Sequence, residues 1–300
     1  MPFLNSGGKS ARARSELLLA AVIVARSGSF LLSKIALRSM VPLNLLAVRF
    51  VMAFAFLALL FRRRLAKADL GTVWRGLLIG AVFIATMACE LMGLRTSESS
   101  RIAFLENSAF VFVPIYQAVL TRRLPAFRTV VSVLVTLAGI ACLTLKDGFS
   151  GFSPGDLFGV ASAMLYACAI IITDRVTRGY DAFTIGIVQV GGMALFSTLA
   201  AFAFATPHLP QTGTEWLCVG GLALVCSGFG FTLQPVAQSG TTAERAGLFC
   251  ALAPVSAGFL GWLVLGERLS SRGLLGAALV MTGILIPHFW HEKVGADRVA

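Results

Sequence analysis

Apolar stretches of membrane-spanning length alternate with short polar connections along the whole chain. Each stretch has about 20 residues, the length that a helix needs to cross a hydrocarbon core of about 30 Å. Ten such stretches can be assigned, so the pattern predicts an all-α integral membrane protein with ten transmembrane helices. The predicted spans are residues 16–37, 43–61, 73–94, 101–121, 127–145, 156–174, 183–205, 215–236, 246–265 and 272–290.

The second half of the chain repeats the first. At a shift of 140 residues Arg26 aligns with Tyr166, and at a shift of 144 Glu90 aligns with Gln234. Each half holds five spans, an odd number, so the second half must enter the membrane from the opposite side. Inverted repeats of this kind are typical of secondary transporters. The expected parts are an N-terminal segment 1–14, a first five-helix repeat 15–145, a linker 146–155, a second repeat 156–290 and a tail 291–300.

Basic residues gather in the connections between the spans and predict the orientation of the chain. With a cytoplasmic N-terminus, about 16 Lys and Arg residues fall on the cytoplasmic side and about 7 on the other. The positive-inside rule therefore predicts that both termini are cytoplasmic and that the linker is extracytoplasmic. With 57% hydrophobic and 13% charged residues, the composition excludes a water-soluble globule. The net charge of +11 comes from the basic residues that set the orientation of the chain in the membrane. The Lys and Arg residues do not form a basic patch interleaved with aromatic residues, as a nucleic-acid-binding surface would.

Cysteine and histidine give no sign of a metal site. All six cysteines lie inside apolar segments without paired metal-ligand spacing, and the three histidines lie in a loop or near the C-terminus. We therefore expect no metal and no cofactor. An intramembrane enzyme would need a nucleophile with a base, or a metal set, within the spans, and the sequence offers neither.

Four charged side chains lie inside predicted spans, away from the span ends: Arg26, Arg49, Glu90 and Glu106. A charge at the centre of a bilayer costs at least about 2.5 to 3.5 kcal/mol, so each needs a partner, water or a function. All four belong to the first half, and Arg26 is predicted to lie nearest the midplane. Two interpretations stay open: the charges neutralise one another in structural ion pairs, or they line a substrate site.

The site interpretation predicts a small substrate that carries both signs of charge. Arg26 would hold a carboxylate and Glu90 or Glu106 an amine, through charge-assisted hydrogen bonds. Neutral groups from the second half would face them, and Gln117 shares a helical stripe with Glu106. The candidate substrate-binding residues are Arg26, Glu90, Glu106, Asn107, Gln117, Tyr166, Gln189 and Gln234.

Several short patterns, in order along the chain, resemble the EamA-type transporters of the drug/metabolite transporter superfamily. They are Pro42 with Arg49-Phe50, GLRTSESSRIAFLEN (93–107), LQPVAQSGTTAERAGLFCALAP (233–254) and LGERLS (265–270). The resemblance implies ten helices, cytoplasmic ends, a central cavity and transport of small metabolites, often amino acids, without ATP. The chain departs from the family pattern where relatives usually carry Trp, at Arg26, and where they frequently carry Gln, at Glu90. Neutral residues are also common in the family where this chain has Glu106-Asn107.

Taken together, these patterns predict a secondary transporter in a bacterial inner membrane that moves an amino-acid-like or zwitterionic metabolite by alternating access, with export favoured. Its partners are the lipid bilayer and the substrate. Coupling to protons through Glu90 or Glu106 and uncoupled flux are both open, and the sequence does not determine the oligomeric state. The alternatives are transport of amphipathic drugs, amines or nucleotide-derived metabolites, a non-transporting membrane scaffold, and an intramembrane enzyme.

Overall fold

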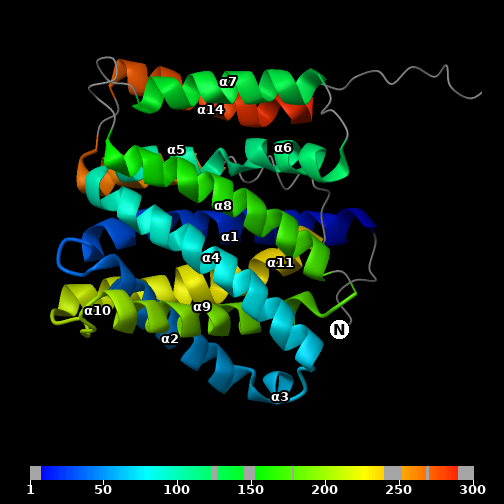
Figure 1. Ribbon diagram of the computed structural model, residues 1–300, viewed down its shortest axis with the longest axis vertical. Helices are drawn as coiled ribbons and strands as arrows, with labels where there is room; N and C mark the ends of the chain where they lie inside the picture. The colour runs from blue at the N-terminus through cyan, green and yellow to red at the C-terminus, as the bar shows by residue number, and fades with distance from the viewer. Residues whose placement is uncertain are drawn as a thin grey trace, which may run out of the picture.

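The computed structural model describes residues 8–122, 127–144, 153–177, 179–239, 252–267 and 270–289, and regular structure in this part of the chain is helical throughout (Figure 1). The first repeat contains α1 (Gly8–Ala36), α2 (Pro42–Leu60), α3 (Arg62–Leu65), α4 (Leu70–Thr96), α5 (Ser99–Asn107), α6 (Ala109–Thr121) and α7 (Phe127–Thr144). The second contains α8 (Pro154–Thr177), α9 (Ala182–Phe204), α10 (Gly213–Gly221), the π-helix η2 (Leu222–Phe231), α11 (Thr232–Ser239), α13 (Leu252–Leu260), the π-helix η3 (Gly261–Leu265) and α14 (Ser271–Phe289).

Six helical segments of the described residues are long and apolar enough to cross a membrane. They are Leu17–Ala36, Pro42–Leu60, Leu70–Thr96, Pro154–Thr177, Ala182–Phe204 and Gly213–Phe231. Each coincides with a predicted span to within a few residues. The predicted spans 127–145 and 272–290 also match single helices, α7 and α14.

Local sequence explains where several helices begin. The carboxylate of Asp69 accepts a hydrogen bond from the backbone N–H of Thr72 at the start of α4, and Asp181 caps α9 in the same way. At the start of α10, Thr212 and Glu215 form a reciprocal capping box. Each of these side chains satisfies backbone donors that the first turn of a helix leaves unpaired.

The fourth and eighth predicted spans are each divided into shorter helices, and the ninth changes from α13 to the π-helix η3. The fourth, 101–121, divides at Ser108 into α5 and α6, where the Ser108 hydroxyl donates to the carbonyl of Leu105 (2.5 Å) and the Asn107 amide donates to Ala103 (2.8 Å). Such side-chain bonds to nearby carbonyls compete with the regular helical ladder. The eighth, 215–236, is built from α10, η2 and α11, and π-helical turns frequently occur at functional sites. Part of the ninth, 246–251, lies outside the described residues.

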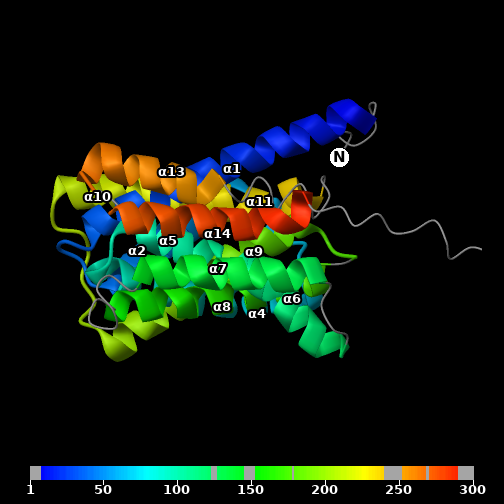
Figure 2. The same ribbon diagram turned by 90° about the horizontal axis from the view of Figure 1, so that it is seen from above.

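The two repeats interlock, and their contacts come in matched pairs (Figures 1 and 2). The third span of the first repeat, α4, packs on the first span of the second, α8, while α1 packs on η2, which belongs to the third span of the second repeat. In the same way α4 on α9 is matched by α2 on η2, and α5 on α8 by α1 on α13. The pairs α2 with α9, α5 with α13 and α7 with α14 each join corresponding spans. This pattern is that of a two-fold relation between the repeats.

The outermost pair, α7 and α14, forms a layer of its own at the top of Figure 1. The two backbones approach closely because glycine faces the partner helix on each side. A Cβ atom on Gly139 would lie 2.6 Å from the backbone N of Val280, and one on Gly283 would lie 2.9 Å from that of Thr136. Small residues at such contacts replace the hydrophobic drive that is missing between helices in lipid.

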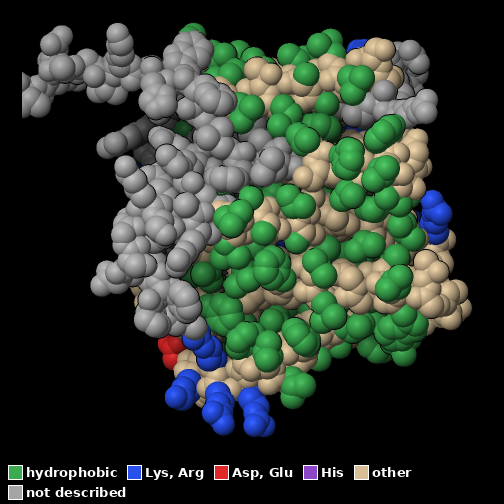
Figure 3. All heavy atoms as spheres, turned by 180° about the vertical axis from the view of Figure 1, so that it is seen from behind, with side chains coloured by type: hydrophobic (Ala, Val, Ile, Leu, Met, Phe, Trp, Pro, Cys, Tyr) green, Lys and Arg blue, Asp and Glu red, His purple; other side chains and the backbone are tan. Residues whose placement is uncertain are grey.

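The surface of the helical bundle is largely apolar. Hydrophobic side chains cover much of the face in Figure 3, and the exposed large ones include Leu59, Phe202 and Leu275. Lys and Arg side chains gather at the end where α3 lies, and Arg62 and Arg63 are exposed there. An apolar wall with a basic end is what a multi-pass membrane protein presents to lipid and to the adjoining water.

Candidate functional site

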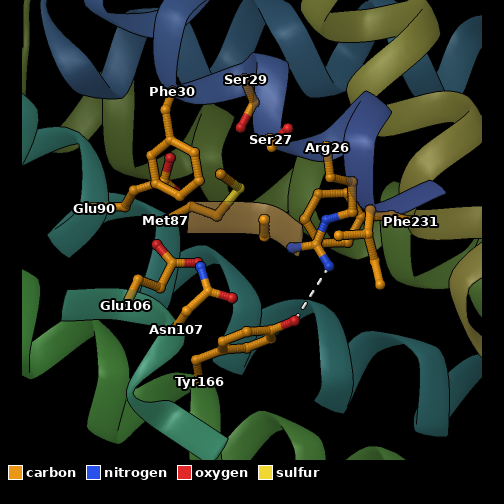
Figure 4. A pocket seen from close by; sticks show the side chains of 12 residues that line it. Arg26, Ser27, Ser29, Phe30, Met87, Glu90, Glu106, Asn107, Tyr166 and Phe231 are labelled. Atoms are coloured by element: carbon orange, nitrogen blue, oxygen red, sulfur yellow. Dashed lines mark hydrogen bonds between the residues drawn. The ribbon is translucent and has the colours of Figure 1, made fainter. Parts of the chain in front are cut away.

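A cavity of about 40 Å³ lies inside the bundle, between the repeats (Figure 4). Its lining residues are Ile23, Arg26, Ser27, Ser29, Phe30, Met87, Glu90, Glu106, Asn107, Tyr166, Phe231 and Ala253. Since one water needs roughly 10–15 Å³, the cavity has room for a few water molecules. Pockets that enclose a small molecule usually measure about 300–1,000 Å³, so the cavity is too small for a metabolite in this conformation.

The walls of the cavity come from three matched pairs of spans. The first repeat supplies α1, α4 and α5, and the second supplies α8, the end of η2 and α13. On α1, Ile23, Arg26 and Phe30 share one face because they are spaced by one and two helical turns. Charge is distributed unequally, since Arg26, Glu90 and Glu106 all belong to the first repeat.

Arg26 crosses the cavity from α1 to the second repeat. Its Nη1 donates a hydrogen bond to the hydroxyl of Tyr166 (3.2 Å), and its Cζ lies 4.4 Å from the ring centroid of Phe231 and 5.7 Å from that of Tyr166. A cation within about 6 Å of an aromatic face is attracted by the ring quadrupole. A Cβ atom on Gly230 would lie 2.6 Å from Cγ of Arg26, so the absence of a side chain at residue 230 makes room for the arginine.

Glu90 and Glu106 reach the same cavity from α4 and α5. Both side chains are buried, with 2% and 5% of their surface exposed. Glu106 Oε2 accepts a hydrogen bond from the Ser162 hydroxyl (3.3 Å), which also lies within reach of the carbonyl of Thr86. In the described part of the chain, Oε1 of Glu90 is buried without a hydrogen-bond partner. Buried polar atoms are nearly always paired, so this oxygen is available to a ligand or to water.

Five of the eight predicted site residues meet at the cavity: Arg26, Glu90, Glu106, Asn107 and Tyr166. Gln117 is exposed on α6 and Gln189 is buried in α9, and neither lines the cavity. The side chain of Gln234 lies outside the described residues. Substrate binding by these residues stays a prediction. Among the described residues, His, Cys, Asp and Glu side chains form no group of three or more that could hold a metal ion.

Sequence reasoning missed the apolar part of the wall, Phe30, Met87 and Phe231. Phenylalanine and methionine do not stand out in an apolar span. The repeat offered a signal, because Met87 aligns with Phe231 at the same shift of 144 residues that relates Glu90 to Gln234.

Arg49 lies outside the cavity that Arg26 lines. It is 1% exposed, its Nε donates to the Ser227 hydroxyl of η2 (2.6 Å), and its Cζ lies 5.1 Å from the ring centroid of Phe50. Arg49 is absent from the cavity wall. Its described contacts therefore favour the structural interpretation, in which it joins α2 to η2.

At one end of the bundle, the turn between α4 and α5 is held to the second repeat by charged groups. Arg101 Nη1 lies 3.2 Å from Oδ2 of Asp156, and both side chains are buried. Glu267, after η3, accepts hydrogen bonds from the backbone N–H (3.0 Å) and hydroxyl (2.6 Å) of Ser99. Lys34 of α1 donates to the carbonyl of Leu94 (2.6 Å). The sequence analysis counted Lys34 and Arg101 only among the positive residues on the extracytoplasmic side, and it gave no sign of these contacts.

Comparison with known proteins decides the family. The model of the EamA-like transporter family matches residues 13–145 and again residues 153–287. The chain belongs to the EamA-like transporter family. The two matches confirm a duplicated family unit, and they identify the cavity as one enclosed by two EamA repeats.

Relatives of this EamA protein share its length. An uncharacterized transporter of Archaeoglobus fulgidus is 24% identical over 91% of this chain and 96% of its own. The uncharacterized transporter YcxC of Bacillus subtilis is 26% identical over 88% of this chain and 89% of its own. A crystal structure of a protein with 19% identity superposes with a TM-score of 0.65, covering 91% of this chain and 96% of the other, which shows a shared fold. The EamA chain is therefore a membrane transporter by family.

Proposed function

We propose that this EamA protein is a secondary transporter that moves an amino-acid-like or zwitterionic metabolite by alternating access, in the direction of export. The observation that carries the proposal is the composition of the cavity wall, where one arginine and two glutamates face the same small space between the repeats. Buried charges are costly in a membrane and are usually found where a protein binds or moves a charged species.

The proposal includes ten transmembrane helices, arranged as inverted repeats 15–145 and 156–290, in a bacterial inner membrane with both termini cytoplasmic. Two observations support it. The helix contacts pair as a two-fold relation requires. The exposed basic segment α3 lies at the same end of the bundle as the start of α1, as the positive-inside rule asks of the cytoplasmic side (Figure 1).

Within the cavity we assign opposite ends of the substrate to opposite charges. Arg26 binds the carboxylate, because a guanidinium offers two parallel donors to a planar anion. Glu90 and Glu106 bind the amine, and the unpaired Oε1 of Glu90 supplies an acceptor. The Asn107 and Tyr166 side chains add neutral polar groups to the wall.

Transport requires this conformation to open, since the cavity has room for only a few waters. The contacts between the α4–α5 turn and the second repeat, Arg101 with Asp156 and Ser99 with Glu267, close the end that we assign as extracytoplasmic. Release to that side requires them to part. Rocking of one repeat against the other is the motion expected of inverted-repeat carriers.

We further propose protons as the coupling ion. A carboxylate that releases an ammonium group can take up a proton in its place, so Glu90 or Glu106 can exchange one for the other. An inward proton gradient is then expected to accelerate export from proteoliposomes. Flux that depends on the substrate gradient alone would contradict coupling and leave the substrate assignment intact.

Counterflow of radiolabelled zwitterionic amino acids in proteoliposomes tests the substrate assignment. We expect saturable counterflow with the wild type, and a loss of about tenfold or more with Arg26→Trp or Glu106→Gln, since each removes one charge-assisted contact. Arg38→Gln, an exposed arginine outside the cavity, is the matched control and should leave the flux unchanged. Unchanged rate and selectivity with Arg26→Trp would remove Arg26 from the site, and flux of organic amines alone would replace the substrate class.

A further inference from the structure

The position that the Arg26 guanidinium occupies has the chemistry of a general site for organic cations. The Phe231 ring lies beneath the guanidinium, with its centroid 4.4 Å from Cζ, and the Tyr166 hydroxyl accepts one of its hydrogen bonds (Figure 4). Phe83 meets both rings edge-on, at centroid distances of 5.3 Å and 5.8 Å, and thereby fixes their orientation. Aromatic faces of this kind recognise ammonium groups as well as guanidinium groups.

Two carboxyl groups belong to the wall of the cavity that contains this position. Glu90 and Glu106 line the same cavity, and both are more than nine-tenths buried. Within the described residues, Oε1 of Glu90 has no hydrogen-bond donor, although a buried acceptor without a donor is costly. A positively charged ligand with an N–H donor offers a partner to this oxygen and is attracted by the aromatic face.

Arg26 itself leaves little room for such a ligand. Only about 40 Å³ of the cavity remains empty. The arginine stem passes over Gly230, where a Cβ atom would approach Cγ of Arg26 to 2.6 Å. The side chain is long and flexible, so when the cavity opens it can leave this position by rotation about its own bonds.

We propose that Phe231, Tyr166, Glu90 and Glu106 form a cation-binding subsite, which Arg26 fills in this conformation and which takes the ammonium or guanidinium group of a substrate when Arg26 swings away. The inference rests on the proposed function, because the released Arg26 is the group that meets the carboxylate of the substrate. It adds that the cationic end of the substrate lies on Phe231, and that Arg26 acts as a tethered cation that holds the subsite before the substrate arrives.

The proposal is tested by removing the Arg26 side chain and supplying a free guanidinium compound in its place. The full-length Arg26→Ala protein is purified in detergent, and its melting temperature is measured against methylguanidinium chloride, with sodium chloride at equal concentration as the ionic control. We expect a saturable rise in the melting temperature, because a ligand that binds only the folded state stabilises it. Arg26→Lys is the matched control, since its ammonium group still places a cation near the Phe231 ring, and neither it nor the wild type should respond.

A second substitution locates the binding. In the Arg26→Ala background, Phe231→Ala is expected to weaken methylguanidinium affinity by about tenfold or more, the effect of losing a desolvated cation–π contact. No saturable rise with Arg26→Ala would overturn the proposal, and so would an equal rise in Arg26→Lys, which would place the binding elsewhere.

A second variant and a second measurement complete the test. If Arg26→Ala does not fold, Gly230→Ala takes its place, because the added methyl group displaces the stem of Arg26, and absence of a response in that variant overturns the inference. Failure of the proposed function has a different result. The wild type would then show no zwitterion counterflow, while methylguanidinium would still bind to Arg26→Ala.

Discussion

Arg26 and Tyr166 occupy corresponding positions in the two repeats, 140 residues apart, and the Arg26 Nη1 donates a hydrogen bond to the Tyr166 hydroxyl across 3.2 Å. Corresponding residues of a two-fold arrangement can touch only where the axis passes between them. The contact therefore places the axis that relates the repeats inside the cavity. Arg26 is charged and its counterpart Tyr166 is neutral, so the positive charge lies on one side of the axis. Two identical repeats would lack this electrostatic asymmetry.

Tyr166→Phe tests this contact. The substitution keeps the ring and removes the acceptor for a cation at this position, whether the cation belongs to Arg26 or to the substrate. Since a hydrogen bond to a charged group contributes about 1.5 kcal/mol or more, we expect the KM for counterflow to rise about tenfold. The maximal rate should change little. Tyr116→Phe, on α6 outside the cavity, is the control, and equal effects of the two substitutions would argue against a role for the Tyr166 hydroxyl.

The stability contributions of Arg101 and Asp156, which form a buried ion pair, are predicted to depend strongly on each other. Removing one member of a buried pair leaves an uncompensated charge and costs about 3 to 5 kcal/mol, so Arg101→Ala and Asp156→Ala should each destabilise by about that amount. Denaturant unfolding in detergent measures the effect. The double variant should lose less than the sum of the single losses. Additive losses would mean that the two groups do not interact, and the exposed Arg95→Ala should stay within about 0.5 kcal/mol of the wild type.

The contact between α7 and α14 depends on glycine. Gly139→Ala places a methyl group 2.6 Å from the backbone N of Val280, where no flexible side chain can yield, so we expect a loss of about 1 to 3 kcal/mol and a lower melting temperature. Gly220→Ala is the matched control because no atom lies within 4 Å of its added Cβ. That variant should be neutral or slightly stabilised, as alanine favours a helix. Equal losses in both variants would show that the close approach is not the cause.

Hydrophobic length was sufficient to locate most of the helices. Span 43–61 became α2 (Pro42–Leu60) and span 183–205 became α9 (Ala182–Phe204), because an apolar stretch with helical length has few other ways to satisfy its backbone. The positions where a predicted span divides into two helices could not be predicted from hydrophobic length. The turn at Ser108 depends on two side chains that bond to carbonyls of their own helix, and a pattern of hydropathy does not register them.

The same interruption explains part of the site. Arg26, Glu90 and Glu106 could be found because a charge inside an apolar span is conspicuous, and Tyr166 because it aligns with Arg26. Gln117 was chosen on the assumption that one straight helix continues from Glu106, but α6 begins anew after Ser108 and leaves Gln117 exposed. Phe231 could not be predicted from the sequence, because its role depends on a contact with Arg26 that forms only in the folded chain.

Accessibility of Ser27 tests the central claim most directly, because this small residue lines the cavity between the repeats. Ser27→Cys is introduced into a protein whose six native cysteines have been replaced, and a membrane-impermeant maleimide is applied to each side of proteoliposomes in turn. Alternating access predicts that the new thiol reacts from both sides, and that a bound substrate slows both reactions. Reaction from one side alone under every condition, or from neither, would contradict the account.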